Sequence, residues 1–194
     1  MAKTLKIVAV SGGLQRPSRT LALVEHLLDG FTDALPVQTR LVELGELVPR
    51  FGNVLHRAKL PADIEQVLRD IETADLLLVA SPIFRGTYTG LFKHLFDFVH
   101  QDALIDVPVL LAATGGSERH ALAIDHQLRP LFAFFQSHTL PIGVYGTDKE
   151  FDNYRVTGDA LQARIALAVE RALPTLRQRL EAKAVVAPKL SLAA

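Results

Sequence analysis

Short apolar runs alternate with longer amphipathic segments along the chain. Five runs read as strands, at residues 6–10, 37–42, 76–80, 107–113 and 139–145. The first, third and fourth are almost wholly apolar, as in strands that are buried on both faces of a parallel sheet. Apolar residues recur at helical spacing elsewhere, which predicts helices over residues 20–31, 62–73, 90–100, 119–136 and 159–180. This alternation indicates a doubly wound α/β fold.

The chain is long enough for one domain. With 194 residues, 49% of them hydrophobic, it can bury a full core, and we expect the domain to span residues 1–182. Residues 44–60 lack a clear period and contain proline and glycine, so an irregular connection is expected there. Residues 183–194 would form either a flexible tail or an arm that packs on a neighbouring subunit.

Charge and cysteine content narrow the function classes. The 21 basic residues balance the 21 acidic ones, so no long-range field favours nucleic acid or an anionic membrane. The absence of cysteine excludes disulfides, iron–sulfur clusters and thiol catalysis. The apolar run at residues 5–10 is too short for a signal peptide or a membrane span. We therefore expect a soluble, cytoplasmic protein that binds neither nucleic acid nor a membrane.

The loop after the first strand combines small, hydroxyl and basic residues without an acid. Its sequence, SGGLQRPSRT, leads directly into a predicted helix. A helix N-terminus carries roughly half a positive charge, so arginines are poorly placed there unless an anion binds. Loop amides and these side chains would donate hydrogen bonds to a phosphate. The candidate ligands are Ser11, Arg16, Ser18, Arg19 and Thr20; the alternative is a plain turn with Ser18 as the helix cap.

Two further loops follow strands at the same predicted sheet edge, where ligands of such folds bind. Proline and apolar side chains after the third strand offer flat surfaces to a planar ring. Two glycines after the fourth strand let backbone amides approach a ligand. The residues are Pro82, Ile83, Phe84 and Arg85 in the first loop and Thr114, Gly115, Gly116 and Ser117 in the second. Each loop alone could be an ordinary connection, but the three together fit flavin mononucleotide (FMN).

Pro130 lies inside the helix predicted over residues 119–136. Because proline has no N–H, the carbonyl of His126 loses its helical partner. A local π-bulge is one way for a helix to absorb such a defect, and π-bulges often occur at functional sites. The alternative is a kinked core helix in which His126 has no special role.

Other groups of residues that could form a metal site or a hydrolase site give weaker signals. His120 and His126 would lie about 120° apart around a regular helix, and nothing makes His94, Asp97 and His100 converge, so no metal site is expected. The chain has no GxSxG pattern, which argues against a serine hydrolase.

Three stretches resemble the flavodoxin-like NAD(P)H-dependent FMN reductases: SGGLQRPSRT, SPIFRGTYTGLFKHLFD and ATGGSERHALAIDHQLRPLF. The last two are most similar to the flavin reductase components of two-component alkanesulfonate and methanesulfonate monooxygenases. The resemblance, over roughly residues 5–180, implies a five-stranded sheet of order 2-1-3-4-5, FMN with NADH or NADPH, and a homodimer or homotetramer. It also implies export of reduced FMN to a partner monooxygenase, in sulfonate sulfur assimilation.

The resemblance also assigns roles to residues. Those named in the first loop would hold the phosphate, residues 82–85 would flank the flavin ring, and residues 114–117 would meet its polar edge. In the sulfonate-linked reductases the helix matching residues 119–136 carries a π-helical insertion at a subunit contact. His126 and Pro130 would then take part in oligomer contact and flavin exchange. Hydride transfer between nicotinamide and flavin needs position and electrostatics, so no catalytic side chain is assigned.

Two other functions stay open. One is a quinone, azo or metal-ion reductase with permanently bound FMN. The other is a non-enzymatic electron carrier of the flavodoxin type, which the neutral charge disfavours because such carriers commonly dock through an acidic surface. The choice between NADH and NADPH is open, with NADH slightly favoured.

Overall fold

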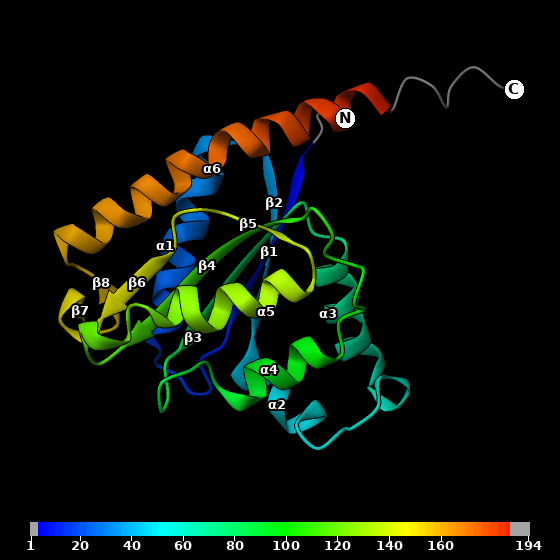
Figure 1. Cartoon of the computed structure of the whole chain (residues 1–194), viewed down its shortest axis with the longest axis horizontal. Helices are drawn as coiled ribbons and strands as arrows, with labels where there is room; N and C mark the ends of the chain where they lie inside the picture. Colours follow the sequence, from blue (N-terminus) through cyan, green and yellow to red (C-terminus); the bar gives the residue numbers. More distant parts are fainter. Residues whose placement is uncertain (1–3, 187–194) are drawn as a thin grey trace, which may run out of the picture.

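The computed structural model describes residues 4–186, and a parallel sheet forms its centre (Figure 1). The strand order is β2-β1-β3-β4-β5, with β6 also paired to β4. The strands are β1 (Leu5–Ser11), β2 (Val37–Glu43), β3 (Leu76–Pro82), β4 (Pro108–Gly115), β5 (His138–Thr139) and β6 (Val144–Thr147). The predicted order 2-1-3-4-5 is confirmed.

Helices cover both faces of the sheet (Figure 1). One layer consists of α1 (Arg19–Ala34) and α6 (Asp159–Val186), and the other of α2 (Leu44–Phe51), α3 (Ala62–Glu72), α4 (Gly90–Asp97) and α5 (Arg129–Phe134). Side chains alternate along β1: Ile7 and Ala9 join the core under the first layer, whereas Val8 and Val10 join the core under the second. Both faces are therefore buried, which accounts for the apolar runs in the sequence.

The central strands end at a common edge of the sheet. Ser11 of β1 pairs with Ala80 of β3, and Pro82 of β3 pairs with Thr114 of β4. The Gly12 amide donates to the Ala80 carbonyl (2.7 Å) and extends this alignment by one residue. The loops after β1, β3 and β4 thus leave the sheet side by side, as the sequence predicts.

The prediction of a single fifth strand over residues 139–145 is wrong. β5 pairs with the beginning of β4 and β6 with its end, and residues 140–143 between them are not strand. Pro141 has no N–H to donate to a neighbouring strand. A Cβ at Gly143 would lie 2.7 Å from Cγ2 of Ile124, so the absence of a side chain allows close packing here. Two short strands therefore share the last position of the sheet.

The expectation of an irregular connection over residues 44–60 is wrong for its first half, which forms α2. The buried residues of this helix recur at helical spacing: Leu44, Leu47 and Phe51. Pro49 lies within the helix and obscures that period. The Gly45 amide donates to the Gly13 carbonyl (3.1 Å), and a Cβ at Gly45 would come within 2.8 Å of the loop backbone. α2 thus supports the loop after β1 by direct backbone contact.

The single helix predicted over residues 119–136 is also wrong, because the segment is divided. It contains a 3-10 turn (Glu118–His120), a π-helix (Ile124–Leu128) and α5. The π-helix confirms the bulge predicted from Pro130. Pro130 lies in the first turn of α5, where a missing N–H is well tolerated.

The other differences between the predicted and the observed elements concern the ends of two helices and one small hairpin. A hairpin of β7 (Phe151–Asp152) and β8 (Arg155–Val156) was not predicted. α4 ends at Asp97 instead of residue 100, whereas α6 continues to Val186. Of the expected tail or arm, residues 187–194 lie outside the described residues. Within residues 4–186, no helix combines the length and the apolar character needed to cross a bilayer.

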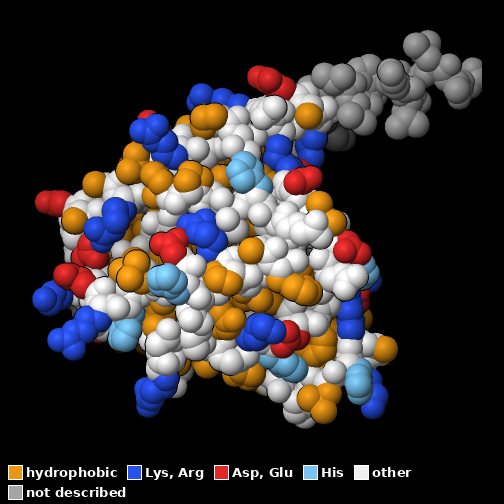
Figure 2. Space-filling model, viewed as in Figure 1, with side chains coloured by type: hydrophobic (Ala, Val, Ile, Leu, Met, Phe, Trp, Pro, Cys, Tyr) orange, Lys and Arg blue, Asp and Glu red, His pale blue; other side chains and the backbone are white. Residues whose placement is uncertain are grey.

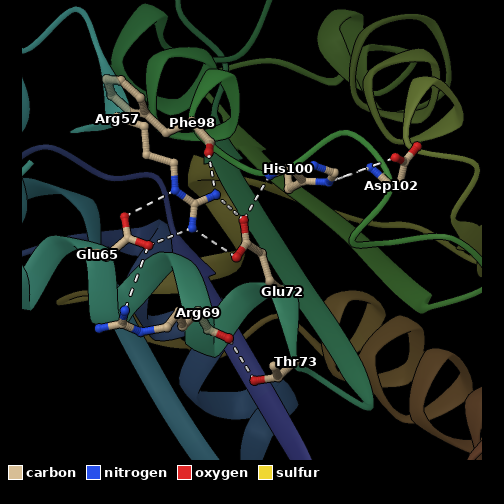
Figure 3. A network of polar contacts seen from close by, with 8 residues as sticks. All are labelled: Arg57, Glu65, Arg69, Glu72, Thr73, Phe98, His100 and Asp102. Carbon is tan, nitrogen blue, oxygen red and sulfur yellow. Dashed lines mark hydrogen bonds and ion pairs between the residues drawn. The ribbon is translucent and has the colours of Figure 1, made fainter.

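Arg57 ties the connection after α2 to α3 and α4 (Figure 3). Its guanidinium donates to Glu65 (2.8 and 3.1 Å), to Glu72 (3.0 Å) and to the Phe98 carbonyl (3.0 Å). Glu72 also accepts the amide of His100 (2.8 Å). Hydrogen bonding from Arg57 lowers the pKa of Glu65 and outweighs the opposing effect of burial. The network fixes the C-terminal end of α4 against α3.

Candidate functional site

A cleft of about 430 Å³ lies beyond the carboxyl ends of the central strands. It is lined by Gly13, Leu14, Gln15, Pro17, Ser18, Arg19, Thr20, Pro82, Ile83, Phe84, Thr114, Gly115, Gly116, Asp148 and Tyr154. Most of the residues predicted to bind FMN are in this lining. Those outside it are Ser11, Arg16, Arg85 and Ser117.

The N-terminus of α1 forms one end of the cleft. Ser18 is its N-cap, and Oγ of Ser18 accepts the amide of Leu21 (3.2 Å). Gly13 passes so close that a Cβ there would lie 2.6 Å from this Oγ. The buried hydroxyls of Thr20 and Thr114 share a hydrogen bond (2.7 Å) that joins α1 to the end of β4. The N-terminus of α1 lines the cleft, so the positive end of the helix dipole faces it, and no acid in the first turn of α1 offsets that charge.

Arg19 is held at the cleft edge by two groups from the segment after β6. Its Nη1 lies 3.4 Å from Oδ1 of Asp148, and its guanidinium carbon lies 5.4 Å from the centroid of the Tyr154 ring. Asp148 begins a 3-10 turn (Asp148–Glu150), and Tyr154 lies in the tight turn between β7 and β8 with a φ of 61°. The cation at the helix N-terminus therefore already has an acidic and an aromatic neighbour.

Glu150 fixes the turn that carries Asp148. Its carboxylate accepts the amide (2.9 Å) and the hydroxyl (3.0 Å) of Thr147 and pairs with Arg164 of α6. Burial by itself raises the pKa of Glu150, but the hydrogen bonds from Thr147 and Arg164 outweigh it and hold this pKa below its ordinary value. Glu150 therefore stays ionised at neutral pH and anchors the turn to α6.

Ser11 and Arg16 lie outside the cleft lining. Ser11 is buried at the end of β1. Arg16 donates from Nε to Glu43 (2.7 Å) and pairs with the same carboxylate through Nη2, while Glu46 lies 3.8 Å from Nη2. These acids are at the start of α2, so Arg16 lies on the α2 side of the loop.

The loop after β3 supplies the apolar side of the cleft. Phe84 is 52% exposed, and it exchanges backbone hydrogen bonds with Thr87 (2.9 and 3.4 Å). Arg85 and Gly86 form the turn between them, with φ of 57° and 89°. Positive φ at both central residues is typical of the tightest hairpin turns. This turn places Phe84 beside the cleft and leaves Arg85 outside its lining.

Gly115 and Gly116 bring the backbone after β4 to the cleft, and Tyr145 supports them. The Tyr145 hydroxyl donates to the Ser117 carbonyl (2.7 Å), and a Cβ at Gly115 would collide with this hydroxyl. Burial and, to a smaller extent, the Asp148 carboxylate raise the pKa of Tyr145, so it remains protonated and keeps donating. Ser117 itself caps the 3-10 turn that follows.

His126 and Pro130 lie in a second hollow, of about 740 Å³, between α4 and the π-helix. Its apolar lining includes Tyr88, Phe96, Leu131, Phe134 and Phe135. Figure 2 shows hydrophobic side chains over α4 and α5 on this face, and Phe134 is 67% exposed. The Thr87 hydroxyl donates to Oε1 of Gln127 (3.1 Å), which connects the π-helix to the turn beside the cleft. We call this hollow the α4–π groove.

Sequence reasoning missed six residues of the cleft lining: Gly13, Leu14, Gln15 and Pro17 in the loop after β1, and Asp148 and Tyr154 beyond β6. The fifth predicted strand ends at the same sheet edge as the others, and that signal points to Asp148, which follows β6. Tyr154 carries no comparable signal because its place depends on a hairpin of two-residue strands.

The cleft fits a ligand with a phosphate at one end and a planar ring at the other. The N-terminus of α1, with Ser18 and Arg19, offers N–H donors and positive charge to the phosphate. Phe84 offers a flat apolar face to the ring, and Gly116 leaves space for a ligand to approach the backbone. In the part of the chain that the structure describes, no group of three or more metal-ligating side chains converges.

Comparisons with known proteins agree with this fit. A family model described as NADPH-dependent FMN reductase matches residues 5–152. The chain is 59% identical to the NADH-dependent FMN reductase SfnF of Pseudomonas fluorescens, over 90% of this chain and 93% of that protein. It is 56% identical to an FMN reductase (NADPH) of Pseudomonas aeruginosa, over 93% of this chain and 97% of that protein.

The solved structures agree as well. An oxidoreductase from Corynebacterium diphtheriae is 29% identical, with a TM-score of 0.79 over 90% of this chain and 98% of that chain. Solved flavodoxins share the fold at TM-scores of 0.60 and 0.56, which confirms the flavodoxin-like architecture. The family match covers every strand of the six-stranded sheet and all of the cleft lining except Tyr154. The chain therefore belongs to the NADPH-dependent FMN reductase family.

Proposed function

We propose that this protein reduces FMN with NADH and releases the reduced flavin to a separate monooxygenase, in the cytoplasm and in the service of sulfonate sulfur assimilation. As a member of its family it is an NAD(P)H-dependent FMN reductase. The observation that carries the proposal is a single cleft that joins the capped N-terminus of α1 to an apolar wall at Phe84. We propose NADH over NADPH as the hydride donor because two relatives named as NADH-dependent are 59% and 58% identical to the chain. One relative named for NADPH is 56% identical.

The residues of the cleft divide the work of binding. Ser18, Arg19 and the amides of α1 would hold the phosphate, and Thr20 would keep the helix in place through Thr114. Phe84 would lie against the ring, and the amides after β4 would face its polar edge, where they favour negative charge. Bound FMN supplies the ring that accepts a hydride from the nicotinamide. The protein contributes position and electrostatics, and we assign no side chain as acid or base.

We also propose that a second copy of the chain occupies the α4–π groove, giving a homodimer or a homotetramer. The groove is rich in aromatic residues, and its charged rim is internally balanced because Lys93 pairs with Asp97. Phe134 in the groove is 67% exposed, and Leu122, which precedes the π-helix and lies outside the groove lining, is 63% exposed. A neutral, aromatic patch of this kind suits a self-complementary contact between identical subunits. The Thr87–Gln127 hydrogen bond would carry the effect of assembly to the cleft.

The test is nicotinamide oxidation by flavin-free protein, with FMN, riboflavin or a quinone titrated in turn. Saturable dependence on FMN, with faster oxidation of NADH than of NADPH and weak flavin binding, is the expected result. Activity that needs tightly retained FMN plus a quinone or azo acceptor would show a reductase with a permanent cofactor. A bound flavin that neither nicotinamide reduces would instead show an electron carrier.

A further inference from the structure

Arg19 and Asp148 are the charged side chains in the cleft lining, as far as the described residues go, and they face each other. Arg16, the other arginine of the loop, is engaged by Glu43 on the α2 side. A phosphate in the cleft therefore depends on Arg19 for its charged partner. Arg19, however, already has the carboxylate of Asp148 beside it.

The position of Asp148 is built by several elements. The Thr147–Glu150 hydrogen bonds and the pair of Glu150 with Arg164 fix its turn at the end of β6. Oδ1 of Asp148 faces Arg19 at 3.4 Å, and its Oδ2 lies 3.8 Å from the Cβ position of Gly116. The carboxylate thus reaches across the cleft edge from the N-terminus of α1 to the glycines after β4.

We propose that Asp148 competes with the flavin phosphate for Arg19, and this rests on the proposed function. Two anions beside one guanidinium repel each other, so phosphate binding weakens the Arg19–Asp148 pair. When the flavin leaves, the carboxylate again pairs with Arg19. The competition lowers affinity for phosphorylated flavins and speeds their release without changing contacts to the ring. Riboflavin has no phosphate and leaves the pair intact.

The test compares dissociation constants of FMN and riboflavin, measured by quenching of flavin fluorescence, for the wild type and Asp148→Asn. Because the Arg19–Asp148 pair is exposed, its removal is expected to tighten FMN binding by about two- to fivefold. FMN dissociation should slow by the same factor. Riboflavin affinity should stay the same. Asp152→Asn is the matched control, because it makes the same charge change at an exposed position of β7 outside the cleft lining.

A double variant shows whether the effect runs through Arg19. In an Arg19→Gln background, Asp148→Asn should tighten FMN binding less than it does in the wild type. Unchanged or weaker FMN binding in both Asp148→Asn and Asp148→Ser, with melting curves like that of the wild type, overturns the competition. A full gain that persists without Arg19 overturns it as well. If the wild type binds FMN and riboflavin but the Asp148 variants have no effect, the competition fails and the reductase function stands. If the wild type binds neither flavin, the competition and the reductase function are both overturned.

Discussion

Gly115 shows how the size of one residue controls the shape of the cleft. The strand β4 ends there, and the hydroxyl of Tyr145 occupies the space where a side chain would lie. The same hydroxyl holds the Ser117 carbonyl and so fixes the path of the loop. One glycine and one phenol therefore place the backbone amides that would face the flavin.

Gly115→Ala is expected to displace this loop, at a cost of about 1–3 kcal/mol in the free energy of unfolding, and to weaken FMN binding. In a Tyr145→Phe background the alanine should cost less, because the nearest remaining ring atom, Cζ, is 3.4 Å from the added Cβ. Denaturant unfolding and FMN titration of the two single variants and the double variant measure this coupling. Strictly additive costs would contradict the collision.

At the scale of elements, Arg57 shows how a short connection holds two helices. It lies in a 3-10 turn (Arg57–Lys59) yet bonds to Glu65 and Glu72 of α3 and to the end of α4 (Figure 3). The loop that carries Phe84 leads into α4, so this network stabilises the element behind the apolar wall. Its three charged side chains are partly buried and joined by several hydrogen bonds, which makes the network stronger than an isolated, exposed ion pair.

Arg57→Gln is expected to lower the free energy of unfolding by about 1–3 kcal/mol at neutral pH, because it leaves two shielded carboxylates without their partner. The pKa of Glu65 is lowered in the folded state, so its contribution is present above the ordinary glutamate pKa of 4.5 and is lost as the pH falls through the folded value. The difference between variant and wild type should therefore shrink in acid. Denaturant unfolding over a series of pH values measures it.

Arg50→Gln is the control for this network. Arg50 pairs with Asp63 at the surface, where both side chains are about half exposed. Its replacement should change the free energy of unfolding by no more than about 0.5 kcal/mol. Equal losses for the two variants, or a loss at Arg57 that does not change with pH, would argue against the role given to the network.

At the scale of the whole molecule, the two hollows lie on different parts of the fold but are physically connected. The cleft lies at the sheet edge, and the α4–π groove lies on the helical layer, with the Thr87–Gln127 hydrogen bond between them. The π-helix is the element common to that link and to the groove. An assembled protein would therefore have its subunit contact close to the turn that presents Phe84.

Phe134→Glu is expected to shift the protein from a dimer or tetramer to a smaller species, because a buried, unpaired carboxylate opposes the contact. Sedimentation equilibrium across a concentration series measures the mass. Leu167→Glu on α6 is the matched control, since Leu167 is exposed (39%) and lies outside the groove. A wild type that is monomeric at all concentrations, or equal masses for the wild type and Phe134→Glu, would rule out this surface as the contact.

Local patterns in the sequence were enough to predict the doubly wound α/β fold, the three loops at one sheet edge and a helix defect at Pro130. The strand order was implied by the family resemblance. An apolar run indicates a buried strand, and a proline removes one helical hydrogen bond. Both are local features of the sequence, so both can be predicted from it. The α2 helix was also present as a local period, but Pro49 obscured it. Flavin binding by the predicted residues, and the role of His126, remain predictions.

Contacts between distant segments were decided by the tertiary structure alone. Two arginines three positions apart in one loop have different partners, because Arg16 meets Glu43 of β2 whereas Arg19 meets Asp148 beyond β6. Likewise, nothing near Gly115 in the sequence shows that Tyr145 fills the space beside it. Such pairs form only when the sheet brings their strands together, so their chemistry depends on long-range packing that no local pattern contains.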